Sequence, residues 1–191
     1  MNPDRNFPSS LYPRLIGPTW HNLDEAVRRV HIEAMPVRAA GSFRIQHGRS
    51  WLVRFLLWLL RLPPAAEAVD TRLTVTSHGN GEQWSRMFGD KAFVTTQWEL
   101  ASGLLGERVG IVELQFRLDV ANGALIYRQT GVALHLGPFC VSLPRWISPR
   151  VAAREEAGGN PNQAHVMVEV LAPLVGLLIL YEGDIERDEA P

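Results

Sequence analysis

The sequence predicts an α+β protein that is mainly β: a single curved antiparallel sheet, or a partly closed barrel, of about nine strands with two N-terminal helices. Three observations predict this class. Apolar residues alternate with a period of two over most of the chain after residue 65, turn residues separate these segments at hairpin-length intervals, and helical spacing is confined to the N-terminal third. Because strands and helices do not alternate along the chain, we expect antiparallel pairing.

Length and charge narrow the possibilities further. The chain has 191 residues, 46% of them hydrophobic, with 19 Lys+Arg against 20 Asp+Glu and a net charge of -1. This length fits a single domain over residues 1–191, with an extended N-terminal arm over 1–18 and a frayed tail over 186–191. The charge balance gives no indication of nucleic-acid binding. The one cysteine, Cys140, excludes an internal disulfide framework and fits a reducing compartment.

The N-terminus lacks the apolar stretch of a secretory signal, so a cytoplasmic location is expected. The most apolar segment, residues 51–62, contains Arg54 and Arg61 and is well short of the ~20 apolar residues that a membrane-spanning helix needs. We therefore expect no transmembrane segment.

The first helix is expected to begin after residue 22 and to continue until residue 36, with Leu23, Ala26, Val27 and Val30 at helical spacing. Asn22 is a candidate N-cap with Glu25 three residues later, apolar residues recur at helical spacing, and Pro36 ends the segment.

The second helix is expected over residues 51–62, between Ser50 and the pair Pro63-Pro64. Apolar side chains cover most of its circumference, which predicts a helix packed against or inside the sheet. Leu56, Leu57 and Leu60 are expected to be buried by sheet residues. These sheet residues include Leu114, Phe116 and Leu118. In an alternative interpretation the helix docks on a partner or a membrane surface, because its tryptophans and arginines suit a headgroup boundary.

The strands are expected where apolar and polar residues alternate between turn signals. Gly79-Asn80-Gly81, Gly89-Asp90-Lys91 and Ala121-Asn122-Gly123 are such signals. The expected strands lie over residues 37–46, 69–76, 83–88, 92–100, 111–120, 124–136, 151–156, 165–170 and 177–185.

Several chemistries have no motif in this chain. There is no phosphate-binding glycine loop, no G-x-S-x-G element, and the six histidines show no metal-ligand spacing. Cys140 stands in an apolar context that favours a small core residue over a nucleophile. We therefore expect no cofactor, no metal site and no catalytic residue that can be assigned from sequence.

One strand combines aromatic residues with a charge on the same face. Trp84, Arg86 and Phe88 share one side of a period-two strand, so an inward aromatic face carries Arg86 inward too. Glu155 shares a face with Val151 and Ala153.

Four interpretations of these residues stay open. Arg86 and Glu155 could pair, or they could form the polar end of an otherwise apolar pocket. Alternatively, Arg86 could stack on its aromatic neighbours at a sheet margin, or the aromatic face could be open to solvent. The candidate lining residues are Trp84, Arg86, Phe88 and Glu155, with Tyr127, Gln129 and Tyr181 as weaker candidates.

Several short segments together resemble a known family. They are Leu11-Tyr12-Pro13-Arg14-Leu15, Leu62-Pro63-Pro64, the segment from Glu82 to Gly89 with its W-x-R-x-F pattern, Leu143-Pro144, Ser148-Pro149, Glu155 and Tyr181-x-Gly183. In this order they resemble the bacterial family called domain of unknown function 4166 (DUF4166). The resemblance implies a bacterial protein without an established activity, in a family sometimes found beside an NAD(P)-binding saccharopine-dehydrogenase-like domain. This chain has no fingerprint for that domain, so an associated reductase would be a separate partner.

The leading hypothesis is a non-catalytic module that binds an apolar or amphiphilic small molecule in a sheet-enclosed cavity, with a polar head against Arg86. The alternative from another class is a small cavity enzyme that uses acid/base chemistry, with Glu155 as base and Tyr127 or Tyr181 as hydrogen-bond donor.

Overall fold

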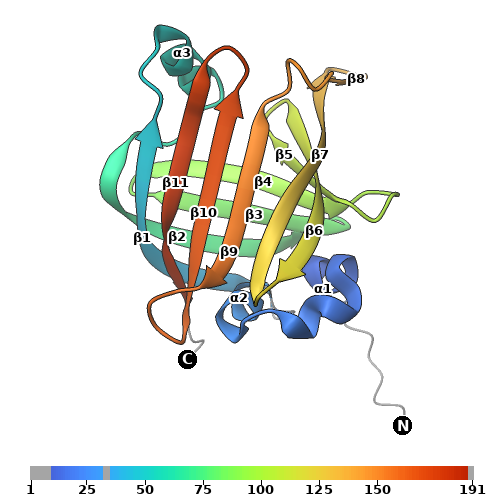
Figure 1. The fold of residues 1–191 in the computed structure, drawn as a ribbon, viewed down its shortest axis with the longest axis vertical. Helices are drawn as coiled ribbons and strands as arrows, with labels where there is room; N and C mark the ends of the chain where they lie inside the picture. The colour runs from blue at the N-terminus through green and yellow to red at the C-terminus, as the bar shows by residue number, and fades with distance from the viewer. Residues whose placement is uncertain (1–9, 32–34, 189–191) are drawn as a thin grey trace.

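The fold is a closed antiparallel β-barrel. The computed structural model describes residues 10–31 and 35–188. Eleven strands form one sheet in the order β6-β5-β4-β3-β2-β1-β11-β10-β9-β7-β8, and the additional pairing of β6 with β7 closes ten of them into a barrel (Figure 1). The short strand β8 extends the sheet beside β7 at one end. All strands of the described residues belong to this one sheet.

The strand bounds follow the turn signals. The strands are β1 (Val37–His47), β2 (Ala66–His78), β3 (Gly81–Phe88), β4 (Lys91–Glu99), β5 (Leu105–Val109), β6 (Val112–Ala121), β7 (Ala124–Leu136), β8 (Phe139–Ser142), β9 (Arg150–Ala157), β10 (Gln163–Ala172) and β11 (Gly176–Arg187). The turn between β6 and β7 takes positive φ at both Asn122 and Gly123, as a tight hairpin requires. The nine expected strands are confirmed.

Two strands, β5 and β8, were not expected from the sequence. The five residues of β5 include Gly106, against which the ring of Trp98 packs, so the segment carries little apolar alternation. The four residues of β8 are all exposed and lie between two prolines, Pro138 and Pro144. Cys140 lies in β8 and is exposed. The expectation of a core cysteine was therefore wrong, because β8 lies at the edge of the sheet.

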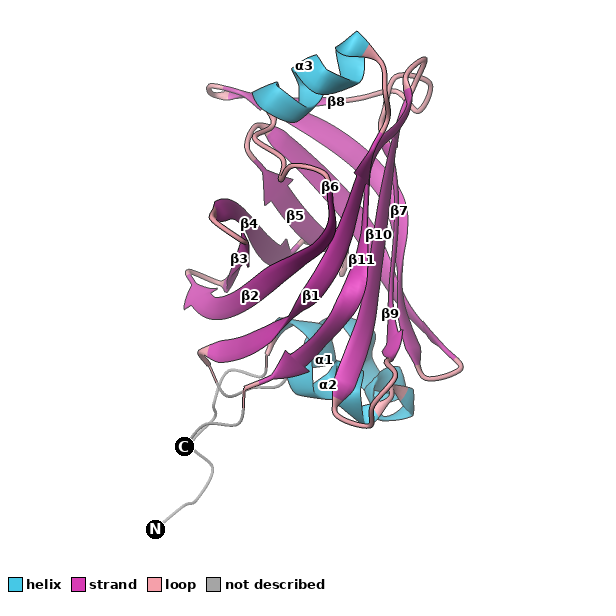
Figure 2. Cartoon of the chain, turned by 90° about the vertical axis from the view of Figure 1, so that its left-hand side faces the viewer, coloured by secondary structure: helices cyan, strands magenta, loops and turns pink. Residues whose placement is uncertain are grey.

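The N-terminal helices close one end of the barrel. They are α1 (Leu11–Ile16), the 3-10 helix η1 (Gly17–Asn22) and α2 (Glu25–Val30), and they lie together below the strands in Figures 1 and 2. Leu11 and Tyr12 are buried. The expected extended arm over residues 1–18 was thus wrong for residues 11–16, which are helical; residues 1–9 lie outside the described part.

The start of α2 and the end of β11 differ from the positions expected from the sequence. The N-cap of α2 is Asp24 and not Asn22, because Asn22 belongs to η1. The expected frayed tail begins too early: β11 continues to Arg187, whose backbone pairs with β1. Residues 189–191 lie outside the described part.

Helix α3 (Trp51–Leu59) lies across the opposite end of the barrel (Figure 2). The hydroxyl of Ser50 accepts a hydrogen bond from the Val53 backbone N–H at 3.2 Å, which caps the helix. Val53 and Leu57 are buried, and the helix packs against β11. Its outer face, however, is exposed. The helix therefore packs against the end of the sheet and is not surrounded by it.

Among the described residues, no helix is long and apolar enough to cross a membrane.

Candidate functional site

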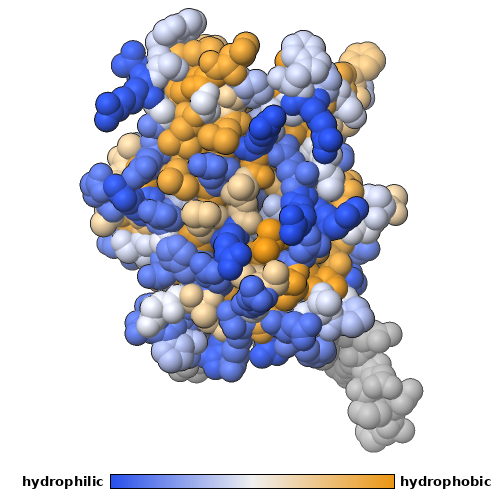
Figure 3. Space-filling view, viewed as in Figure 1, coloured by the Kyte–Doolittle hydropathy of each residue, from blue (hydrophilic) through white to orange (hydrophobic). Residues whose placement is uncertain are grey.

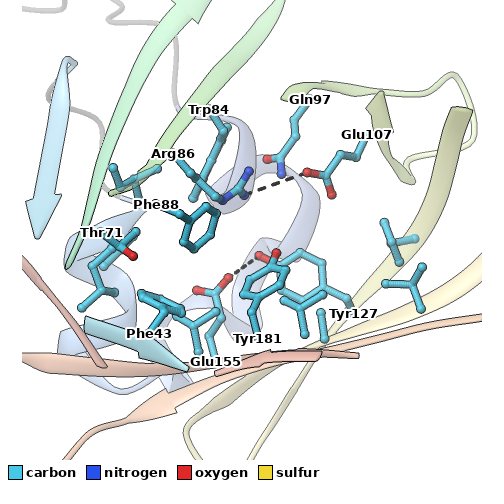
Figure 4. Close-up of a pocket in the computed structure, with 18 residues that line it drawn as sticks. Phe43, Thr71, Trp84, Arg86, Phe88, Gln97, Glu107, Tyr127, Glu155 and Tyr181 are labelled. Carbon is cyan, nitrogen blue, oxygen red and sulfur yellow. Dashed lines mark hydrogen bonds and ion pairs between the residues drawn. The ribbon is translucent and has the colours of Figure 1, made fainter. Parts of the chain in front are cut away.

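The barrel encloses a cavity of about 70 Å³ that touches every barrel strand and α2 (Figure 4). Its lining is mostly apolar, with a small set of polar side chains. The lining residues are Val30, Phe43, Thr71, Leu73, Trp84, Arg86, Phe88, Gln97, Glu107, Phe116, Tyr127, Val151, Ala153, Glu155, Val166, Val168, Tyr181 and Ile185. A mainly apolar wall with a few converging polar groups is the usual composition of a small-molecule site.

The structure brings six sequence-predicted residues to this one cavity. They are Trp84, Arg86, Phe88, Tyr127, Glu155 and Tyr181. The strand period explains this, because residues two apart on β3 and on β9 point to the same side of the sheet. Gln129 is the exception. Its side chain bonds to the backbone of Pro149 and Val151 at 2.8 and 2.6 Å, outside the cavity.

Arg86 projects from β3 into the upper part of the cavity in Figure 4. Its Nη1 donates a hydrogen bond to the hydroxyl of Thr95 at 3.1 Å, and its Nη2 lies 4.0 Å from a carboxylate oxygen of Glu107. The guanidinium carbon lies 5.1 Å from the centre of the Trp84 ring and 5.9 Å from that of Phe93. One hydrogen bond is a small share of the five donors that a guanidinium offers.

Arg86 keeps its charge in this setting. Burial alone would lower the pKa of the Arg86 guanidinium, but the nearby Tyr181 and Glu107 outweigh burial and raise it. Arg86 contacts the aromatic rings of Trp84 and Phe93 inside the barrel and not at a sheet margin.

Glu155 and Arg86 are not paired with each other. One carboxylate oxygen of Glu155 accepts a hydrogen bond from the Tyr127 hydroxyl at 2.7 Å, and the other lies 2.7 Å from Nε2 of His31. Both charges face the cavity, but they take different partners: Arg86 has Thr95 and Glu107, whereas Glu155 has Tyr127 and His31. The interpretation in which the two form a pair was therefore wrong.

The Glu155 carboxylate belongs to a longer line of polar groups. The hydroxyl oxygens of Tyr127 and Tyr12 lie 3.1 Å apart, and the Tyr12 hydroxyl donates to the side-chain oxygen of Gln97 at 2.8 Å. We call His31, Glu155, Tyr127, Tyr12 and Gln97 the buried polar chain. Its members are 8% exposed or less. Tyr12 and His31 come from the N-terminal segment, so the chain fastens that segment to β4, β7 and β9.

Charge at the buried polar chain follows from its contacts. Burial alone would raise the pKa of Glu155, but the charge and hydrogen bond of His31 and the hydroxyl of Tyr127 outweigh burial and lower it. Burial raises the pKa of Tyr12 and Tyr127 well above the usual value, and the neighbouring Glu155 adds to that rise. Burial also raises the pKa of Tyr181, to about 12. At neutral pH the site therefore holds an ionised carboxylate among neutral phenols.

Sequence reasoning missed several of these groups. His31 stands 124 residues from Glu155, and nothing in local spacing joins the two. Glu107 lies on β5, which was not expected as a strand. Gln97 had a usable signal, because it shares a face with Thr95 in a strand that was expected.

A second cluster of ligand-type atoms lies outside the cavity. Glu113, His135 and Cys140 offer one atom each within 4.8 Å of one another. Nε2 of His135 lies 2.7 Å from a Glu113 oxygen and 3.8 Å from the Cys140 sulfur. The shorter distance is a hydrogen bond, whereas two ligand atoms on a tetrahedral zinc ion stand about 3.3 Å apart. We therefore interpret the cluster as a hydrogen-bonded pair beside an exposed thiol.

The fold and the cavity together define an antiparallel β-barrel closed at one end by N-terminal helices, with an enclosed and partly polar interior. The chain belongs to the family described as domain of unknown function (DUF4166), whose model matches residues 23–185. This confirms the resemblance found in the sequence.

Other comparisons add little. No curated protein matches the chain. Among solved structures, the chain is similar to a protein of unknown function from the DUF3598 family of Nostoc punctiforme PCC 73102, with 13% identity and a TM-score of 0.48. The match covers 81% of this chain and 48% of that one, so the chain spans about half the length of that structure.

Proposed function

We propose that the barrel is a non-catalytic binding module for a small apolar or amphiphilic molecule. The observation that carries the proposal is the state of Arg86: a charged guanidinium faces a mainly apolar cavity and makes one hydrogen bond, to Thr95. Its remaining donors can bind an oxygen-bearing head group, while the apolar wall receives the rest of the ligand.

The size of the cavity limits the ligand. Drug-sized ligands occupy pockets of roughly 300–1,000 Å³, whereas this cavity has about 70 Å³. A ligand with a polar head and a short apolar part fits that space. A longer apolar part would have to displace the rings of Phe43, Phe88 and Tyr181, whose centres lie 5.7–6.2 Å apart.

A chain-length series tests the proposal. Straight-chain carboxylic acids of increasing length, and the alcohols of the same length, are titrated into the protein by isothermal calorimetry. Each added CH₂ is expected to tighten binding about fourfold, from ~0.8 kcal/mol per buried CH₂, until the cavity is full. The longest ligand that still gains affinity measures the usable cavity.

The head group is tested with Arg86 variants. Arg86→Gln should weaken binding of the acids by roughly tenfold or more, since hydrogen bonds to a charged group contribute about 1.5–3 kcal/mol, and should change binding of the alcohols much less. Arg72→Gln, at an exposed arginine of β2, is the matched control. Absence of binding for every acid and alcohol, together with no co-purifying compound in native mass spectrometry, would refute the proposal.

A second candidate function has one observation in its favour. Glu155 and Tyr127 both face the cavity and touch each other, which is an arrangement that acid/base catalysis can use. We rank it lower for two reasons. Both oxygens of Glu155 already have partners, and the lowered pKa of Glu155 makes the carboxylate a weak base at neutral pH.

Carbon–hydrogen exchange separates the two functions. Short methyl ketones are incubated with the protein in deuterium oxide and followed by nuclear magnetic resonance. A binding module gives no protein-dependent exchange at the carbon next to the carbonyl. Exchange that disappears in Glu155→Gln would instead support the enzyme.

The cytoplasmic location and a separate NAD(P)-binding reductase as partner stay predictions. Co-purification of the tagged chain from its host, with and without added NADPH, would test the reductase.

A further inference from the structure

The end of the barrel that carries α3 is unusually apolar for a protein surface. Of the twelve exposed large hydrophobic side chains among the described residues, ten belong to α3, the β7–β8 hairpin, the β8–β9 connection and the β10–β11 turn. The ten are Trp51, Phe55, Trp58, Leu59, Leu136, Phe139, Val141, Trp146, Ile147 and Leu174. Scattered apolar residues on a surface need no explanation, but a concentration at one end does.

These segments lie together in space. Figures 1 and 2 both place α3, β8 and the β10–β11 turn at the end opposite α1 and α2. In Figure 3 the surface over α3, at the top of the view, is mostly orange. We call this surface the α3 end.

Helix α3 presents one face to the core and the other to solvent. Val53 and Leu57 are buried, whereas Trp51, Phe55 and Trp58 are 72%, 48% and 74% exposed. The exposed residues follow at intervals of three and four, with Arg54 between them, and so form one outward stripe. The sequence marks this stripe as apolar, yet no part of the described chain covers it.

The segments that form the α3 end carry acidic residues nowhere and arginines at five positions. Residues 47–65, 136–150 and 171–179 contain five arginines and neither aspartate nor glutamate, in a chain whose net charge is -1. The arginines are Arg49, Arg54, Arg61, Arg145 and Arg150, and all five are exposed. The net negative charge of the molecule therefore lies elsewhere on it.

Two carboxylates near the α3 end do not cancel its excess of positive charge. The β3–β4 turn adjoins α3 with one charge of each sign, Asp90 and Lys91, and Lys91 shares a groove with Trp58. Glu113, beside the β7–β8 hairpin, is buried and bonded to His135.

We propose that the α3 end docks on an anionic phospholipid bilayer. Tryptophan rings and arginine side chains are the groups that settle at the boundary between headgroups and acyl chains, and basic residues bind anionic lipid headgroups. Three of the six tryptophans of the chain, Trp51, Trp58 and Trp146, lie at this end. A second copy of the chain is a poor occupant, because the five arginines of each copy would face each other. This inference is independent of what the cavity binds.

Vesicle flotation with the full chain tests the proposal. The protein is mixed with vesicles of phosphatidylcholine alone or of equal parts phosphatidylcholine and phosphatidylserine. We expect flotation with the anionic vesicles and little with the neutral ones, and release by high salt, because screening shortens the reach of the arginine charges. Arg54→Gln/Arg61→Gln should weaken binding roughly 25-fold, at about fivefold for each arginine near an anionic surface.

The apolar contribution has its own variant pair. Trp58→Ser/Trp146→Ser changes two side chains that are more than 70% exposed, so folding should be unaffected while vesicle binding falls at least tenfold. The controls are Val94→Ser, on the exposed face of β4, and Arg72→Gln, on β2; both should bind vesicles like the unaltered chain. Circular dichroism and urea midpoints check that every variant is folded.

Several outcomes would overturn the inference. They are absence of flotation with anionic vesicles, equal flotation with neutral ones, or equal losses in the control variants. Self-association that Trp58→Ser/Trp146→Ser abolishes, without any vesicle binding, would assign the α3 end to a protein contact instead. Arg86→Gln, directed at the cavity, should bind vesicles normally, so this proposal and the ligand-binding proposal fail separately.

Discussion

Replacing Glu155 by alanine removes the central acceptor of the buried polar chain. The His31 side chain is 0% exposed and that of Glu155 is 9% exposed, so bulk water has little access to either group. The variant removes the shared partner of His31 Nε2 and the Tyr127 hydroxyl, and the Tyr127 hydroxyl keeps only the Tyr12 hydroxyl, 3.1 Å away. A buried polar group left unsatisfied costs about 1–3 kcal/mol. Breaking a buried charged pair from one side costs a similar total, roughly 3–5 kcal/mol.

Urea denaturation measures this loss. A protein of this size has a slope of about 2 kcal/mol per molar urea, so a loss of 3–5 kcal/mol lowers the midpoint by roughly 2 M. Glu155→Gln is the matched variant: it keeps the shape and an acceptor for Tyr127, and it should lose less than half as much. A loss below about 1 kcal/mol for Glu155→Ala would refute the argument that these groups are cut off from solvent.

The same carboxylate makes stability depend on pH. The pKa of Glu155 is lower in the folded protein than the ordinary value of 4.5 for a glutamate, so its contribution to stability is complete above that ordinary value and is lost as the pH falls through the folded value. The difference in the free energy of unfolding between the unaltered chain and Glu155→Ala should therefore shrink as the solution is made acidic.

Three further outcomes can be checked. Tyr12 and Tyr127 are buried, Tyr181 is half-buried, and the pKa values of all three are raised, so the folded protein should show little tyrosinate absorbance at pH 10. Their contribution to stability is complete below that pH and is lost as the pH rises through the folded values, about 12 for Tyr181. An early tyrosinate signal from folded protein would contradict this. Leu57→Ala should cost about 2–5 kcal/mol in urea unfolding, whereas Trp58→Ala, on the exposed side of α3, should stay within about 0.5 kcal/mol; equal costs would contradict the packing of α3. Gly41→Ala should lower the free energy of unfolding by about 1–3 kcal/mol in the same assay, because a Cβ there would overlap the backbone oxygen of Asp184. An unchanged urea midpoint would refute this close approach of β1 and β11.

The faces of the strands could be predicted from sequence, and their partners could not. Period-two alternation put Trp84, Arg86 and Phe88 on one side, and the structure places all three on the cavity wall. Alternation carries no information about which distant residue will lie opposite. The partner of Glu155 is His31, from a helical segment at the other end of the chain, and so the sequence left a pairing with Arg86 open.

Helix α3 illustrates a different limit. Its start after Ser50 was predictable from capping chemistry. A helix that is apolar all round normally indicates complete burial, because water disfavours every face. The structure buries only the side with Val53 and Leu57, and composition alone cannot say that the other side stays open.

Barrel closure also has a consequence for how the molecule forms. The seam between β1 and β11 joins residues as distant as Ala39 and Arg187, and the contact between His31 and Glu155 spans 124 residues. The seam cannot exist while the ribosome is still producing the last strand, and the contact of His31 must wait for β9. Until then Tyr12 and His31 have no barrel to enter, and β1 is an unpaired edge on one side. Contacts between such distant residues slow folding, and an open edge invites pairing with other chains. The N-terminal segment is therefore synthesised first, but it forms its contacts with the barrel late.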